Sequence, residues 1–158
     1  MYIFRAMLAI VFICSSSVTY GQDSNKSLAV IVNSGVPQES VSEEELGQIL
    51  LGDTRFWDGG GLITLLIQAP VSWERDTVLG KIMQMSEPQY RQFWISKVFR
   101  AEVASGPKVV LSNEMAGILV SKIPGAMAFV DDGEIPMDTK VLKVNGLLPG
   151  ESGYPLNF

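Results

Sequence analysis

The residues best suited to binding chemistry lie in one stretch, Ser72-Trp73-Glu74-Arg75. Ser72 is predicted to cap a helix over residues 73–85, and a helix N-terminus offers unpaired N–H groups and the positive end of the helix dipole. The Ser72 hydroxyl adds a hydrogen-bonding group, and Arg75 can form two parallel hydrogen bonds with an oxyanion or a carboxylate. Glu74 brings its own negative charge and Trp73 its own bulk. The same stretch therefore also fits a contact with a protein.

Each of these residues also has a purely structural interpretation. Ser72 fits a helix cap alone, and Arg75 fits a solvated residue or a partner of Glu74 or Asp76. Trp73 fits either a lid over the core or an exposed contact. These alternatives stay open from sequence, so Ser72 and Arg75 are candidate ligand-binding residues and Trp73 and Glu74 are candidate interface residues.

The composition argues against catalysis and against metal or nucleic-acid binding. The chain has no histidine, and Cys14 is its single cysteine, which excludes Ser-His and Cys-His catalysis and the usual zinc sites. No spacing of acids or nucleophiles is typical of a hydrolase, so we expect no catalytic residue, no cofactor and no enzyme activity. The net charge is −5 and no Lys/Arg cluster is present, so a nucleic-acid partner is not expected.

Two acidic groups outside the central stretch fit structural roles. The run Glu43–Glu45 follows Ser42 and is typical of a helix start. Asp131, Asp132 and Glu134 fit a solvated hairpin, with a calcium site as the alternative.

The first residues are predicted to form a signal peptide, residues 1–21. A positive charge at Arg5 precedes the apolar run Ala6–Cys14, and small and polar residues follow up to Gly21. The apolar run is too short for a transmembrane helix. We therefore expect a periplasmic or secreted protein with no transmembrane segment after cleavage; acylation of Cys14, as in a lipoprotein, is the alternative.

Residues 22–158 are predicted to form one α/β domain with a mostly parallel sheet. Apolar runs rich in β-branched residues alternate with amphipathic or capped segments, which is typical of strands alternating with helices. The expected strands are 28–33, 62–68, 108–111, 126–130 and 141–144, and the expected helices are 42–51, 73–85, 86–100 and 112–123. Trp57 and Trp94 lie among apolar neighbours and are predicted to be buried.

Several segments, read in order, resemble the substrate-binding proteins of phosphate ABC transporters. The stretch Val41–Gly52 with Phe56–Gly60 resembles that family's helix and its Trp-x-Asp-Gly turn. Further segments resemble the family in the same order: Tyr90–Phe99 with Pro107, Val120–Val130 (VSKIPGAMAFV), Val144–Pro149 and Tyr154–Leu156.

The resemblance implies the type II periplasmic binding protein fold, which has two α/β lobes with a ligand cleft between them. This chain is about half the expected length, and its segments match a single lobe, the second, with the returning strand. The family's Ser-Gly-Thr-Arg loop, which holds phosphate, is matched by Ser72–Arg75. Trp73 replaces the glycine that allows close backbone approach, and Glu74 replaces the threonine with a carboxylate.

Two functions follow as hypotheses. The first is an exported, periplasmic binding module without tight phosphate binding by the monomer. It would bind an inorganic oxyanion or a protein partner, and a second copy of the chain or the partner would supply the other lobe. The second is a structural or regulatory adaptor that kept the fold and lost ligand binding.

Overall fold

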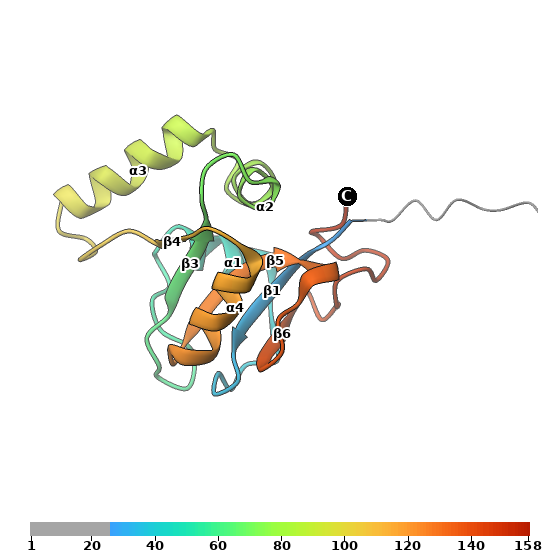
Figure 1. Cartoon of the computed structure of the whole chain (residues 1–158). Helices are drawn as coiled ribbons and strands as arrows, with labels where there is room; N and C mark the ends of the chain where they lie inside the picture. The colour runs from blue at the N-terminus through green and yellow to red at the C-terminus, as the bar shows by residue number, and fades with distance from the viewer. Residues whose placement is uncertain (1–25) are drawn as a thin grey trace, which may run out of the picture.

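The computed structural model describes residues 26–158, which form a single sheet with helices on both faces (Figure 1). The predicted signal peptide and Cys14 lie outside the described residues. None of the helices between residues 26 and 158 has the length and apolar character needed to span a bilayer. The strands are β1 (Leu28–Asn33), β2 (Ser40–Val41), β3 (Thr64–Gln68), β4 (Lys108–Val110), β5 (Ala126–Asp131) and β6 (Thr139–Val144).

The sheet has the order β2-β6-β1-β5-β3-β4 and is mostly parallel, as predicted. Strand β1 runs antiparallel to both of its neighbours, β5 and β6. The other pairings, β2 with β6, β3 with β5 and β3 with β4, are parallel. The carboxyl ends of β3, β4 and β5 therefore meet at one edge of the sheet.

The helical segments are α1 (Glu43–Leu50), α2 (Trp73–Thr77), η1 (Val78–Met83), α3 (Glu87–Phe99), α4 (Asn113–Lys122) and η2 (Asp132–Glu134). Helices α1 and α2 and segment η1 cover one face of the sheet, α4 covers the other, and α3 extends beyond β3 and β4 (Figure 1). The helix predicted over residues 73–85 is thus two segments, because η1 has π-helical geometry.

The core has two parts, one on each face of the sheet. Leu28, Val30 and Val32 of β1 pack with α1, η1 and α3, and the alternate residues Ala29 and Ile31 pack beneath α4. Because both faces of the central strands are covered, β1 and β5 are continuous apolar runs in the sequence. Trp57 and Trp94 are buried in the first part, which confirms their prediction as core residues.

Helix α1 begins with a complete capping box. The Ser42 hydroxyl accepts from the Glu45 N–H at 3.1 Å, and the Glu45 carboxylate accepts from the Ser42 N–H at 2.6 Å. The bonds to Ser42 lower the pKa of Glu45. The run Glu43–Glu45 is therefore a helix start, as predicted.

Gly125 fixes the entry into β5. Its φ is +74°, and a side chain there would lie 2.2 Å from the Leu62 carbonyl oxygen. The Gly125 carbonyl accepts from the buried indole N–H of Trp57 at 3.0 Å. This turn ties the start of β5 to the start of β3.

Candidate functional site

The candidate site lies where the chain leaves the carboxyl ends of β3, β4 and β5. Helix α2 follows β3, α4 follows β4 and η2 follows β5. In open α/β sheets, ligands bind in the crevice outside the carboxyl ends of the parallel strands. The stretch Ser72–Arg75 lies at this edge, because it follows Gln68, the last residue of β3.

Ser72 caps α2, as predicted. Its hydroxyl accepts from the Arg75 N–H at 3.2 Å, and its carbonyl accepts from the Asp76 N–H at 3.0 Å. One lone pair of the hydroxyl is thus committed to the cap. The candidate role of Ser72 in ligand binding remains a proposal.

Arg75 is buried, with 4% of its surface exposed, and each of its three guanidinium nitrogens donates one hydrogen bond. Nε and Nη2 donate to the two carboxylate oxygens of Glu87 at 2.7 and 3.0 Å, and Nη1 donates to the Gln68 carbonyl at 2.9 Å. The interpretation of Arg75 as solvated, or as a partner of Glu74 or Asp76, is wrong. Its partner is the first residue of α3, so Arg75 joins α2, α3 and β3.

Tyr90 lies against the same guanidinium. The Arg75 Cζ atom is 4.7 Å from the centroid of the Tyr90 ring, a cation–π distance. Burial raises the pKa of Tyr90 to about 12, and the nearby Arg75 charge acts in the opposite direction. The phenol therefore stays neutral throughout the physiological range.

Glu74 belongs to a second, acidic network that spans the edge of the sheet. The Asn113 side-chain amide donates to Glu74 Oε1 at 3.1 Å and to Glu134 Oε2 at 2.7 Å. Gln68 Nε2 donates in turn to the side-chain oxygen of Asn113, Oδ1, at 2.8 Å. One amide therefore holds two carboxylates together, and Glu74 is only 7% exposed. An anion placed here would face both negative charges.

Trp73 faces away from this network, toward the two ends of the described chain. Its ring packs edge-on against Phe158 with centroids 6.0 Å apart, and Lys26 Nζ lies 3.9 Å from the ring centroid. The side chain is half-buried and packs against the core. Of the two interpretations of Trp73, the geometry favours the lid.

Each of the three loops at this edge exposes one large apolar side chain. Val71 is 95% exposed, Leu111 is 73% exposed and Ile135, next to Glu134, is 39% exposed. Val71 also has φ of +72°, a left-handed conformation that is unfavourable for a β-branched residue. Such strain and such exposed apolar groups are common at functional surfaces.

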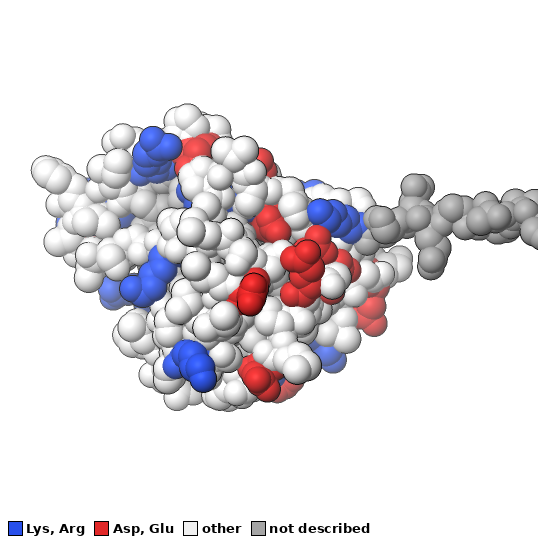
Figure 2. Space-filling model, viewed as in Figure 1, with Lys and Arg blue, Asp and Glu red and all other residues white. Residues whose placement is uncertain are grey.

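The same edge is rich in acidic residues. Asp76 and Glu134 are exposed and Asp132 is partly exposed, and Figure 2 shows acidic side chains gathered on the visible face beneath α2. Asp131, from the calcium alternative, pairs with Lys26 at 3.3 Å. Within residues 26–158 no three acidic, histidine or cysteine side chains are placed to hold a metal ion.

Sequence reasoning missed Gln68 and Asn113 as site residues and considered Glu134 only as part of a solvated hairpin or a calcium site. Gln68 is a polar residue that ends an otherwise apolar strand, which could have marked it as part of a site. Asn113 begins α4 next to Ser112. Ser112 is the cap, so the Asn113 side chain is free to point into the network.

The fold is similar to that of solved phosphate-binding proteins. An ABC-type phosphate transport receptor from Vibrio cholerae has a TM-score of 0.67 and 19% identity, over 84% of this chain and 53% of the receptor. PstS from Borrelia burgdorferi has a TM-score of 0.67 and 18% identity, over 84% and 54%. A phosphate binding protein from Stenotrophomonas maltophilia has a TM-score of 0.54 and 15% identity, over 80% and 41%.

At these identities the likeness establishes the fold, that of the periplasmic binding proteins. The chain spans about half the length of the solved structures it matches. No protein-family model and no curated protein sequence matches it.

Proposed function

We propose that this chain is an exported, single-lobe binding module whose carboxyl-edge face binds a basic protein partner and does not bind inorganic phosphate tightly. The carboxyl-edge face is defined by Val71, Glu74, Leu111, Glu134 and Ile135. It lies at the edge where open α/β sheets bind their ligands.

The observation that carries the proposal is the arrangement of apolar and acidic groups on this face. Three exposed apolar side chains lie at the same edge of the sheet as two carboxylates that share one amide. Protein interfaces derive much of their binding energy from a few apolar anchors, and complementary charges select the partner. A partner with apolar contacts and a lysine or arginine fits this arrangement.

An oxyanion fits the face poorly. Arg75, the candidate anion ligand, already binds both oxygens of Glu87, so its hydrogen-bonding fork is occupied. Glu74 and Glu134 add negative charge at the same edge. Two like charges about 4 Å apart cost on the order of 1–4 kcal/mol near a protein surface.

A second copy of the chain also fits poorly as the occupant of this face. Two copies that met there would bring the same carboxylates together, and like charges across an interface disfavour association. The net charge of −5 acts in the same direction. A basic partner would relieve this repulsion and supply the other wall of the cleft.

Export is supported by the order of charged, apolar and small residues in residues 1–21. The similar solved structures include transport receptors, which agrees with a location outside the cytoplasm. The chain without residues 1–21 is therefore the form we expect to act.

The test uses the tagged, exported chain in its own cell envelope, with chemical cross-linking before purification. We expect a partner that is recovered with the wild type and with Lys122→Glu, a charge-changing control on α4, but lost with Glu134→Lys. Titration of the purified chain with inorganic phosphate should give no binding below about 1 mM. Micromolar phosphate binding, or a partner whose recovery is unaffected by Glu134→Lys, would contradict the proposal.

A further inference from the structure

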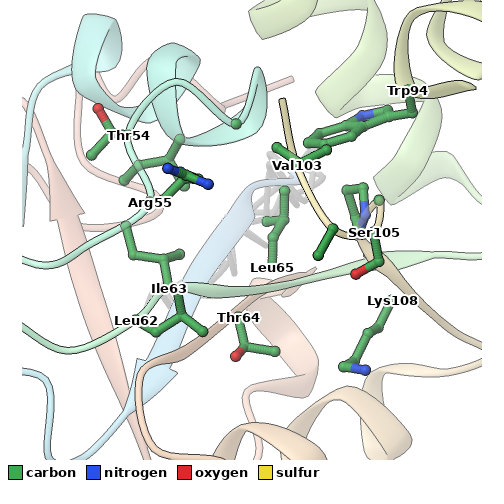
Figure 3. A pocket seen from close by; sticks show the side chains of 15 residues that line it. Thr54, Arg55, Leu62, Ile63, Thr64, Leu65, Trp94, Val103, Ser105 and Lys108 are labelled. Carbon is green, nitrogen blue, oxygen red and sulfur yellow. The ribbon is translucent and has the colours of Figure 1, made fainter. Parts of the chain in front are cut away.

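A cavity of about 270 Å³ lies at the opposite edge of the sheet, where β3 and β4 begin (Figure 3). It is bounded by the end of α1, the start of β3, the middle of α3 and residues 103–108. Leu65 lines the cavity and Gln68 ends β3 at the carboxyl edge, roughly 10 Å further along an extended strand. The cavity is therefore independent of the function proposed above.

The walls of the cavity are mostly apolar. Aliphatic side chains from three segments and one indole ring supply them: Ile49, Leu62, Ile63, Leu65, Val103 and Trp94. Small ligands bind in concave, mostly apolar sites with a few well-placed polar groups. The apolar walls of this cavity therefore suit a hydrocarbon chain or an aromatic ring.

The charged residues that line the cavity are all basic. Arg55 and Lys108 line it and no acidic residue does, in a chain whose net charge is −5. Figure 3 shows the two side chains on different sides of the cavity, with Leu65 between them. The hydroxyl groups of Thr64 and Ser105 also line the cavity, beside Lys108.

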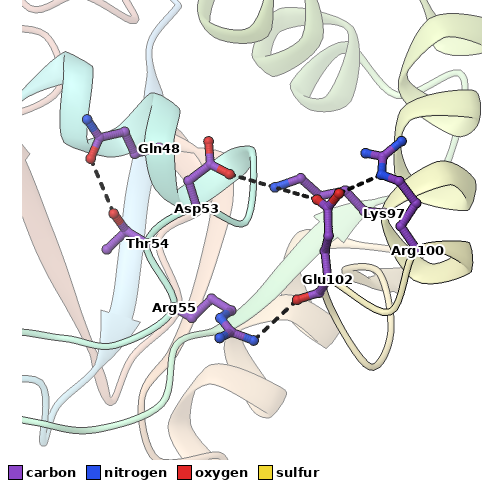
Figure 4. A network of polar contacts seen from close by, with 7 residues as sticks. All are labelled: Gln48, Asp53, Thr54, Arg55, Lys97, Arg100 and Glu102. Carbon is purple, nitrogen blue, oxygen red and sulfur yellow. Dashed lines mark hydrogen bonds and ion pairs between the residues drawn. The ribbon is translucent and has the colours of Figure 1, made fainter.

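The neighbouring acids are already neutralised by other cations (Figure 4). Asp53 pairs with the buried Lys97 at 2.6 Å, and Glu102 pairs with Arg100. The hydrogen bond from Arg100 lowers the pKa of Glu102, so the pair persists as ions. Arg55 makes only a long contact, 3.5 Å, to the Glu102 carbonyl oxygen. Among residues 26–158 neither Arg55 nor Lys108 has an ion-pair partner.

We propose that this cavity binds a small carboxylate with an apolar body. The apolar walls would enclose the hydrocarbon part, and Lys108, beside the hydroxyls of Thr64 and Ser105, would bind the carboxylate through a charge-assisted hydrogen bond. Arg55, on the other side of Leu65, would add positive charge without touching the carboxylate. The cavity volume of about 270 Å³ suits a medium-chain or single-ring carboxylate.

The experiment is a titration of the purified chain, residues 22–158, with octanoate and with octanol, followed by backbone NMR. Octanoate should bind with a dissociation constant of about 0.1–1 mM. Resonances of Thr64, Leu65 and Lys108 should shift while those of residues 72–75 stay fixed. Octanol, which has the same chain and no charge, should bind at least about tenfold more weakly.

Four exposed substitutions make the assignment specific. Lys108→Gln should weaken octanoate binding about fivefold, because it removes the charged hydrogen bond to the carboxylate, whereas Arg55→Gln should weaken it only about twofold, because it removes a more distant charge. Ser105→Trp should abolish binding by filling the cavity, and Lys122→Gln on α4 should leave binding unchanged.

The proposal fails if octanoate produces no shifts at about 10 mM, or if octanoate and octanol bind equally. It also fails if Lys108→Gln binds octanoate like the wild type. Shifts confined to residues 72–75 would place the anion at the carboxyl-edge face and would count against both proposals. Loss of the protein partner alone would leave this inference unaffected.

Discussion

The guanidinium of Arg75 binds both carboxylate oxygens of Glu87: Nε donates to one oxygen at 2.7 Å and Nη2 donates to the other at 3.0 Å. This contact joins the first turn of α2 to the first turn of α3, two segments that both follow β3 in the chain. Arg75 therefore has a structural role, whereas the resemblance to the Ser-Gly-Thr-Arg loop implied that this arginine binds phosphate. The stability of the domain should therefore depend on Arg75.

Arg75→Ala should lower the free energy of unfolding by about 2–4 kcal/mol, because it leaves the Glu87 carboxylate and the Gln68 carbonyl without their donor. The value is below that of a fully buried pair, since 28% of the Glu87 side chain is exposed. Urea melts measure the change. Arg91 approaches the same Glu87 at 3.9 Å but is 68% exposed, so Arg91→Ala should cost less than about 0.5 kcal/mol. Equal effects of the two variants would contradict the structural role of Arg75.

Asn113→Ala should destabilise the domain by about 2–3 kcal/mol. The change removes the only side-chain donor that the structure gives Glu74 and leaves the Gln68 amide without its acceptor. Glu114→Ala, at the exposed neighbouring position, is the matched control and should have little effect. If the two variants melt alike, the acidic network does not help to hold the three strand ends together.

Alkaline pH should destabilise the domain partly through Tyr90. Its pKa rises from 10.0 to about 12 because it is buried. Between these values the unfolded chain binds fewer protons than the native chain, so the free energy of unfolding falls as the pH rises. Tyr90→Phe should reduce this loss by about 2 kcal/mol.

The measurement is a set of urea melts of both proteins at pH 8 and pH 12. The free energy of unfolding should fall less between pH 8 and pH 12 in Tyr90→Phe than in the wild type. Burial also raises the pKa of Tyr154, but Tyr154 is present in both proteins and so does not affect the difference. Parallel pH profiles would mean that Tyr90 ionises as easily in the folded protein as in the unfolded chain.

Replacement of Trp73 by glycine together with Glu74 by threonine should raise phosphate affinity from undetectable to measurable. The double change restores close backbone approach, removes one of the two carboxylates and adds a hydroxyl. Calorimetry on the wild type and the variant tests it. Because Glu87 binds Arg75, adding Glu87→Gln to the double variant should release the guanidinium and strengthen phosphate binding further. A wild type that already binds phosphate in the micromolar range would refute this interpretation of the loop.

The sequence was sufficient for five of the six strands, the helix caps and the fold class, because these depend on neighbours in the chain. Ser42 and Ser72 cap helices as predicted, and the apolar run of β1 is buried on both faces. Strand β2 was missed because two residues carry no periodicity. The antiparallel direction of β1 was missed because a buried apolar run does not encode strand direction.

The candidate site was only partly predictable, because its contacts cross between elements. The structural alternative for Arg75 paired it with Glu74 or Asp76, its neighbours in the sequence, whereas its partner Glu87 lies 12 residues further on. Asn113 meets Gln68 across 45 residues and Glu134 across 21. These residues come into contact only when three parallel strands place their carboxyl ends together. The sequence alone does not give the order of the strands.

The central claim is that the carboxyl-edge face binds a protein, and site-specific photo-cross-linking in the cell envelope tests it most directly. A photoreactive residue is placed in turn at Val71, Leu111 and Ile135, with Phe99 on α3, which is 90% exposed, as the control. We predict one cross-linked partner, the same from all three positions, absent at Phe99 and lost when Glu134→Lys is added. No cross-link from any of the three positions, an equal cross-link from Phe99, or a product made only of two copies of this chain would contradict the account.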